Sequence, residues 1–116
     1  MNIKKCKIAV LGLGYVGLPL LLEFSKKFRV IGFDTDQNKI YEIKKIIKNK
    51  FIVSSDQNLL KDCNIFIVTV PTPIYANKTP NLNALKKATQ IISNVLKKGD
   101  LVIFESTVYP GVTKTF

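Results

Sequence analysis

The feature that most constrains the sequence is a set of three glycines, Gly12, Gly14 and Gly17, which directly follows an apolar run. In the spacing G-x-G-x-x-G, the first glycine permits a tight turn out of a strand. The second lets the backbone approach a pyrophosphate, and the third lets the next helix pack close against the sheet. The N–H groups at the start of that helix then face the phosphates. The spacing therefore predicts a dinucleotide-binding turn; a turn of the same composition that binds nothing is the alternative.

A second predicted strand supports the dinucleotide interpretation. The run Val30 to Phe33 ends in Asp34, which lies twenty residues after Gly14. An acidic residue at this place is positioned to accept hydrogen bonds from the adenosine ribose hydroxyls. A carboxylate there also repels a 2′-phosphate, and no Arg or Lys immediately follows it. The sequence therefore predicts NAD as the cofactor in preference to NADP.

The composition narrows the range of partners. The chain has 116 residues, of which 47% are hydrophobic and 22% are charged, values typical of one globular domain. Its 18 Lys and Arg residues against 8 Asp and Glu give a formal net charge of +10. These basic residues fall in ones and twos, without an arginine-rich arm or a helix-turn-helix pattern. We therefore expect no nucleic-acid partner, and we expect a positive field that attracts anionic nucleotides.

Three other classes of protein are disfavoured. Lys4, Lys5 and Lys7 precede an apolar run as in a signal peptide, but glycines and Pro19 interrupt that run. No uninterrupted apolar stretch approaches the roughly 18 residues of a membrane span, so no membrane partner is expected. Two cysteines without C-x-x-C spacing, in a chain that has no histidine, argue against a metal site. We expect a cytoplasmic protein with reduced thiols.

The hydrophobic periodicity predicts strands that alternate with helices. The expected strands are Cys6–Leu11, Arg29–Phe33, Lys50–Val53, Asn64–Val70 and Leu101–Glu105. The expected helices are Tyr15 to about Lys27, a helix capped by Asp36 that runs to about Asn49, a short helix within Ser54–Asp62, and Asn83 to Lys97 with Gly99 at its C-cap. This alternation predicts an α/β fold, a Rossmann-type doubly wound parallel sheet with the strand order 3-2-1-4-5.

The same periodicity predicts which helical residues face the core. For the second long helix, these residues are Ile40, Ile43, Ile46 and Ile47. For the last helix, they are Leu85, Ala88, Ile91, Ile92, Val95 and Leu96.

Two further motifs follow strands of the expected sheet. VTVPTPI at 68–74 and ESTVYPG at 105–111 each close a strand at its C-terminal end, the edge at which open α/β sheets bind ligands. Together with GLGYVGLPL and GFD, they resemble the N-terminal NAD-binding domain of the UDP-glucose/GDP-mannose dehydrogenase family, over nearly the whole chain. The resemblance is greatest to the UDP-N-acetylglucosamine/UDP-N-acetylgalactosamine 6-dehydrogenase branch, which serves capsule and O-antigen synthesis.

The resemblance implies an NAD-dependent oxidoreductase that oxidises the C6 alcohol of a UDP-sugar twice, to the carboxylate. It implies that cofactor-binding residues lie in the glycine loop, at the second strand end and in the two later turns. These are Gly12, Leu13, Gly14, Tyr15, Val16, Gly17, Asp34, Lys39, Val70, Pro71, Thr72, Pro73, Ile74, Ser106 and Thr107.

Within this set the resemblance assigns distinct roles. Asp34 would hold the adenosine ribose with Lys39 beside it, and Val70 to Ile74 would line the nicotinamide half. Thr107 would be the one catalytic residue, since it matches a threonine that helps to hold a water. From the residues alone, Thr107 is only a hydroxyl at a strand end, for which a capping or turn role is an equal alternative.

The chain departs from the family pattern in two places. The family's nucleophilic cysteine, central dimerisation helix and UDP-binding domain would all follow Phe116, so we expect residues 1–116 to form only the NAD-binding domain. Such a domain would not turn over substrate by itself, whereas the full-length family member would be a homodimer or larger. Cys6 and Cys63 are both expected at the opposite edge of the sheet. The stretch 43–51 is also shorter than the resemblance predicts.

Two other functions remain open at this point. The first is a dinucleotide-binding module without catalysis. The second is another dehydrogenase, of the 6-phosphogluconate or 3-hydroxyacid type, which would share the glycine spacing but not the VPTP and ESTVYPG motifs.

Overall fold

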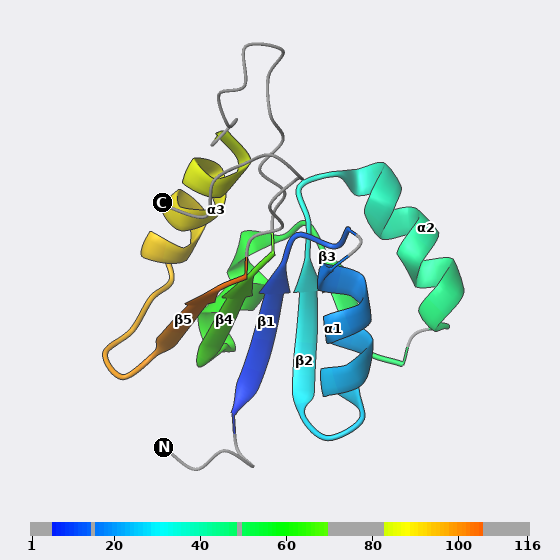
Figure 1. The fold of residues 1–116 in the computed structure, drawn as a ribbon, viewed down its shortest axis with the longest axis horizontal. Helices are drawn as coiled ribbons and strands as arrows, with labels where there is room; N and C mark the ends of the chain where they lie inside the picture. The colour runs from blue at the N-terminus through cyan, green and yellow to red at the C-terminus, as the bar shows by residue number, and fades with distance from the viewer. Residues whose placement is uncertain (1–5, 15, 49, 70–82, 106–116) are drawn as a thin grey trace, which may run out of the picture.

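The computed structural model describes residues 6–14, 16–48, 50–69 and 83–105. At its centre is a sheet in the order β3-β2-β1-β4-β5, in which every neighbouring pair of strands is parallel (Figure 1). The strands are β1 (Lys7–Leu11), β2 (Arg29–Phe33), β3 (Ile52–Ser54), β4 (Ile65–Val68) and β5 (Leu101–Phe104). The predicted fold class and strand order are confirmed.

Helices cover both faces of this sheet, as a doubly wound fold requires. They are α1 (Gly17–Ser25), α2 (Gln37–Ile47), the 3₁₀ helix η2 (Gln57–Asp62) and α3 (Asn83–Ser93). In Figure 1, α1 and α2 lie to the β2 side of the sheet, and α3 lies near β4 and β5.

Two hydrophobic clusters fill the space between the sheet and its helices, because alternate residues of a strand point to opposite faces. One cluster joins the even-numbered residues of β1 to α1 and α2, and includes Ile8, Val10, Leu21, Ile40, Ile43 and Ile47. The other joins the odd-numbered residues of β1 to η2, β4 and α3, and includes Ala9, Leu11, Leu60, Phe66, Ile91 and Ile92.

Helix α2 begins as predicted but ends earlier. The Asp36 side chain caps it by accepting hydrogen bonds from the N–H groups of Asn38 and Lys39, at 3.0 and 3.3 Å. The helix ends at Ile47 because Lys48 adopts a left-handed conformation, with a φ of 51°. The prediction for Ile46 was wrong, since its side chain is 65% exposed. Each helical residue turns about 100°, so Ile46 lies about 90° around α2 from the centre of the stripe formed by Ile40, Ile43 and Ile47, at the edge of the buried face.

Helix α3 also ends earlier than predicted, at Ser93 rather than Lys97, so Gly99 is not its C-cap. Gly99 has a φ of 91° and lies in a turn in which the Asp100 N–H donates to the Lys97 carbonyl at 3.0 Å. A positive φ in such a turn favours glycine. Leu96 was predicted to face the core and is instead 47% exposed.

The other boundaries lie within one or two residues of those predicted. Helix α1 starts at Gly17 rather than Tyr15, and β3 starts at Ile52 rather than Lys50. Strand β4 ends at Val68, whereas the prediction continued it to Val70, which lies outside the described residues. Helix ends commonly fray by this amount, so these differences leave the topology unchanged.

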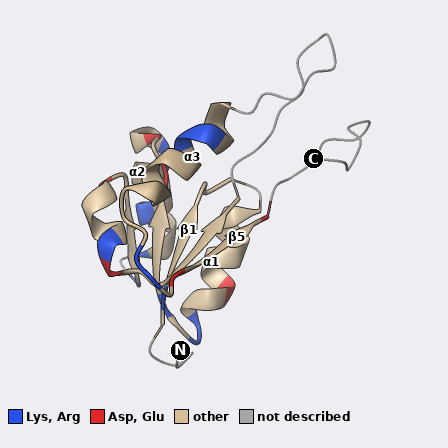
Figure 2. Ribbon diagram, turned by 90° about the vertical axis from the view of Figure 1, so that its left-hand side faces the viewer, with Lys and Arg blue, Asp and Glu red and all other residues tan. Residues whose placement is uncertain are grey.

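No helix within the described part of the chain is long and apolar enough to cross a membrane. Figure 2 shows the lysine and arginine residues spread over several elements, including α2 and α3. The basic residues are therefore dispersed over the fold as well as along the sequence.

Candidate functional site

The C-terminal ends of β1, β2 and β4 meet at one edge of the sheet. Leu11, the last residue of β1, pairs with Phe33, the last residue of β2. The ladder continues one residue further, because the Gly12 N–H donates to the Phe33 carbonyl at 2.9 Å and the Thr69 N–H donates to the Leu11 carbonyl at 2.8 Å. Gly12 thus lies between Asp34 and Thr69, at the edge where open parallel sheets bind ligands.

The three glycines of the loop meet different requirements. Gly12 has a φ of 94°, a conformation that L side chains rarely adopt, and it turns the chain out of β1. A Cβ at Gly17 would overlap the Gly12 carbonyl oxygen and the Thr69 hydroxyl, so α1 can begin this close to β4 only without a side chain there. At Gly14, no heavy atom of the described residues, its chain neighbours apart, lies within 4 Å of the place that a Cβ would take. This open space beside the backbone fits the pyrophosphate of a dinucleotide.

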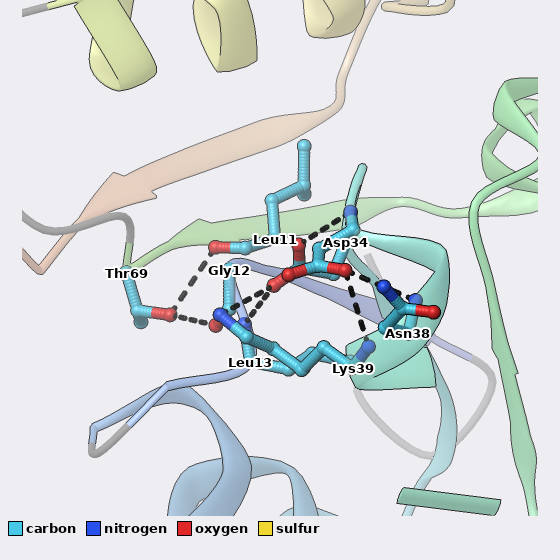
Figure 3. A network of polar contacts seen from close by, with 8 residues as sticks. Leu11, Gly12, Leu13, Asp34, Asn38, Lys39 and Thr69 are labelled. Carbon is cyan, nitrogen blue, oxygen red and sulfur yellow. Dashed lines mark hydrogen bonds and ion pairs between the residues drawn. The ribbon is translucent and has the colours of Figure 1, made fainter. Parts of the chain in front are cut away.

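Asp34 is the buried acid of this edge, with 9% of its surface exposed. Its Oδ2 accepts a hydrogen bond from the Leu13 N–H at 2.9 Å, and its Oδ1 accepts one from the Asp36 N–H at 3.0 Å. The Nζ of Lys39 lies 3.5 Å from Oδ2. Figure 3 shows these contacts joining the glycine loop, the end of β2 and the start of α2. A carboxylate accepts about four hydrogen bonds, so Asp34 can still accept ribose hydroxyls.

Thr69 is a site residue that the sequence analysis missed, because it treated the residue only as part of a buried strand. The Thr69 side chain lies at the end of β4, and the residue is 3% exposed. Its Oγ1 lies 2.5 Å from the Gly12 carbonyl oxygen and 3.2 Å from that of Leu11 (Figure 3). The signal that could have found it is a hydroxyl within an otherwise apolar run, directly before the VPTP motif.

Part of the predicted site falls within the described residues. There the structure brings together Gly12, Leu13, Gly14, Val16, Gly17, Asp34 and Lys39 at one edge of the sheet. Tyr15, the segment Val70, Pro71, Thr72, Pro73 and Ile74, and the pair Ser106 and Thr107 lie outside the described residues. Their roles stay predictions.

The two cysteines lie at the other edge of the sheet, as predicted. Cys6 precedes β1, Cys63 precedes β4, and both residues are buried. Burial raises the pKa of the Cys63 thiol from 9.0 to about 11, against the smaller opposing effects of Lys7 and Lys97. Among the residues that the structure describes, no three His, Cys, Asp or Glu side chains are grouped so that they could hold a metal ion.

A model of the UDP-glucose/GDP-mannose dehydrogenase family, NAD binding domain, matches residues 6–116. The chain belongs to this family. Its cofactor is therefore NAD, which agrees with the open space at Gly14 and the buried carboxylate of Asp34. The match also decides against the 6-phosphogluconate and 3-hydroxyacid dehydrogenases as alternatives.

Relatives of this NAD-binding domain are much longer proteins. The chain is 51% identical over 124 residues to UDP-N-acetyl-D-glucosamine 6-dehydrogenase of Pseudomonas aeruginosa, covering 96% of the chain and 29% of the relative. It is 42% identical over 126 residues to the protein of that name from Salmonella typhi, covering 97% and 30%. The aligned stretch of 124 positions exceeds the 116 residues of this chain, so the Pseudomonas relative carries residues there that this chain lacks.

Solved structures agree with the family assignment. The structure of UDP-D-ManNAc dehydrogenase from Pyrococcus horikoshii matches with a TM-score of 0.79 and 34% sequence identity, covering 93% of this chain and 30% of that one. The domain thus spans 29 to 30% of the length of these relatives.

Proposed function

We propose that this NAD-binding domain serves a UDP-N-acetylhexosamine 6-dehydrogenase, which oxidises the sugar C6 alcohol to a carboxylate in two steps for surface polysaccharide synthesis. The observation that carries the proposal is the 51% identity, over 96% of the chain, to a relative named for that reaction. Other relatives are named for N-acetylmannosamine and N-acetylgalactosaminuronic acid. The proposal therefore names the N-acetylhexosamine class and not one sugar.

The described residues would hold the cofactor through backbone and carboxylate groups. The backbone from Gly12 to Gly17 would lie against the pyrophosphate, because a dinucleotide needs both the open space at Gly14 and the positive end of α1. Asp34 would accept the adenosine ribose hydroxyls, since Leu13 and Asp36 already fix its carboxylate at this edge. When bound, NAD accepts the hydride that each oxidation removes from the sugar carbon.

The remaining predicted residues complete the proposal. Val70 to Ile74 would line the nicotinamide half, and Ser106 and Thr107 would lie beside it, with Thr107 holding a water. The support for these roles is the sequence order, because both segments directly follow strands whose C-terminal ends lie at the edge that carries the glycine loop.

The cofactor site can be tested by titrating NADH into the chain and following its fluorescence. We expect Gly14→Val to abolish binding with no change in the circular dichroism spectrum, since the added side chain would occupy the space of the pyrophosphate. A matched control is Leu22→Val, which places the same side chain on the exposed surface of α1. Normal binding by Gly14→Val would show that the glycine loop is not the site.

The enzymatic proposal can be tested with a chimera, in which this chain replaces the corresponding domain of the Pseudomonas aeruginosa relative. We expect the chimera to reduce NAD in the presence of UDP-N-acetylglucosamine, and the chimera with Gly14→Val to be inactive. A folded chimera that binds NAD without reducing it would favour a dinucleotide-binding module without catalysis.

A further inference from the structure

The Asp34 carboxylate is contacted by two backbone N–H groups and by one ammonium group. Its oxygens accept hydrogen bonds from the N–H groups of Leu13 and Asp36, and its side chain is 11% exposed. Lys39 places its Nζ 3.5 Å from Oδ2, and its side chain is 42% exposed. The carboxylate is therefore fixed by the fold, whereas the lysine beside it is the more exposed of the two side chains and is accessible to a ligand.

The start of α2 brings Lys39 to this place. Asp36 caps the helix and holds the N–H groups of Asn38 and Lys39, so Lys39 belongs to the first turn. Side chains of an α-helix lean toward its N-terminus. The lysine therefore extends back toward the end of β2, although five residues separate it from Asp34 in the sequence.

This arrangement changes the electrostatic argument for cofactor choice. A 2′-phosphate carries roughly two negative charges where NAD has a neutral hydroxyl. Asp34 repels that group at close range, but an ammonium 3.5 Å from the same carboxylate attracts it. The N-terminus of α2 offers less attraction than usual, because the Asp36 carboxylate already occupies two of its N–H groups. The two side chains therefore act on a 2′-phosphate with opposite signs.

We propose that Lys39 is a specificity-determining residue that limits the preference of this domain for NAD over NADP. The inference rests on the proposed cofactor site, because it requires the adenosine ribose to lie against Asp34. The preference for NAD over NADP then depends on two opposing electrostatic effects, and each side chain supplies one of them. Asp34 raises the preference for NAD, and Lys39 lowers it.

The experiment measures dissociation constants for NADH and NADPH by fluorescence titration of the chain and its variants. Lys39→Met removes the charge and keeps most of the aliphatic stem. We expect it to weaken NADPH binding about two- to fivefold more than it weakens NADH binding, as the loss of one partly exposed charge contact predicts. Asp34→Asn should tighten NADPH binding, and the double variant Asp34→Asn/Lys39→Met should lose most of that gain.

Lys45→Met is the matched control. Lys45 also lies on α2 and also pairs with a carboxylate, since its Nζ is 3.7 Å from Glu42 Oε1, but it belongs to the last turn of the helix. We expect its NADH-to-NADPH preference to equal that of the unmodified chain. An equal shift in this variant would indicate a general effect of net charge, and would overturn the inference.

Two other outcomes separate this inference from the proposed site. If the chain binds NADH and the preference is unchanged in Lys39→Met, or both cofactors weaken equally, Lys39 does not determine specificity and the site itself stands. If the chain binds neither cofactor at millimolar concentration, the proposed site fails and the inference fails with it.

Discussion

Thr69 and Asp34 hold the two sides of one peptide unit, the bond between Gly12 and Leu13. The Thr69 Oγ1 lies 2.5 Å from the Gly12 carbonyl oxygen, and Asp34 Oδ2 accepts from the Leu13 N–H at 2.9 Å. The carbonyl and N–H of a trans peptide point in opposite directions. The glycine loop is therefore fixed between the ends of β4 and β2, and Asp34 is oriented by the loop that it helps to hold.

This relationship makes Thr69 a positioning residue. Thr69→Val keeps the shape of the side chain but leaves the Gly12 carbonyl without the hydroxyl, a change that costs about 1–3 kcal/mol for a buried polar group. We expect the variant to be less stable by that amount in urea unfolding and to bind NADH several-fold more weakly. Thr69→Ser restores the hydroxyl and should recover NADH affinity. Equal weakening in both variants would show that packing, and not the hydrogen bond, is responsible.

Substitutions at Gly14 and at Gly17 should have different effects, the first on cofactor binding and the second on stability. A Cβ at Gly17 would overlap backbone and Thr69, so Gly17→Ala should destabilise the fold by roughly 1–3 kcal/mol through overpacking. Gly14→Ala places its methyl group in open space and should leave the unfolding midpoint nearly unchanged while it weakens NADH binding. Thermal unfolding followed by circular dichroism distinguishes the two variants. The reverse pattern would contradict the roles assigned to these glycines.

Cys63 should make stability fall at alkaline pH. Its pKa is raised by burial from 9.0 to about 11, so between these values the unfolded thiol loses its proton while the folded thiol keeps it. The unfolded state then binds fewer protons, and the free energy of unfolding decreases as the pH rises from 9 to 11. The expected loss is about 2 kcal/mol.

Other groups titrate in the same range, so the variant Cys63→Ala provides the comparison. Urea unfolding of both proteins at several pH values should give a steeper alkaline decrease for the parent chain. Parallel pH profiles would show that Cys63 does not contribute.

The chain by itself should bind NAD without reducing it. The two cysteines of the sequence lie at the N-terminal edge of the sheet, whereas the glycine loop lies at the C-terminal edge. A strand of five residues, at about 3.3 Å per residue, separates these edges by roughly 15 Å. Neither thiol can then attack a group bound at the cofactor. NADH absorbance after addition of UDP-N-acetylhexosamines checks this, and thiol-dependent NADH production would contradict it.

Local patterns predicted most of the fold and the centre of the site. The glycine turn after β1, the acid at the end of β2 and the buried strands depend on residues near one another in sequence, and the described residues have all three at the predicted places. The wrong predictions concern residues whose burial or conformation depends on helix geometry or on contacts distant in the sequence. Ile46 is apolar but turned away from the core, and Gly99 serves a turn after α3 has ended.

Long-range contacts explain the rest. Thr69 meets Gly12 across 57 positions of sequence, and no local pattern marks that pairing. The resemblance placed Lys39 beside Asp34, and the structure gives the reason, because Asp36 fixes where α2 begins. The prediction of NAD from Asp34 took into account only the residues that immediately follow Asp34 in the sequence. In the folded chain, Lys39 in the first turn of α2 lies beside the same carboxylate.

The most direct test of the cofactor site is an NMR titration of the isotopically labelled chain with NAD. We predict that the largest amide shifts occur at Gly12, Leu13, Gly14, Gly17 and Asp36, which surround the loop and the Asp34 carboxylate. Amides at the opposite edge of the sheet, such as those of Cys63 and Asn64, should not move. Saturable shifts at Cys63 and Asn64 with none in the glycine loop would contradict the account.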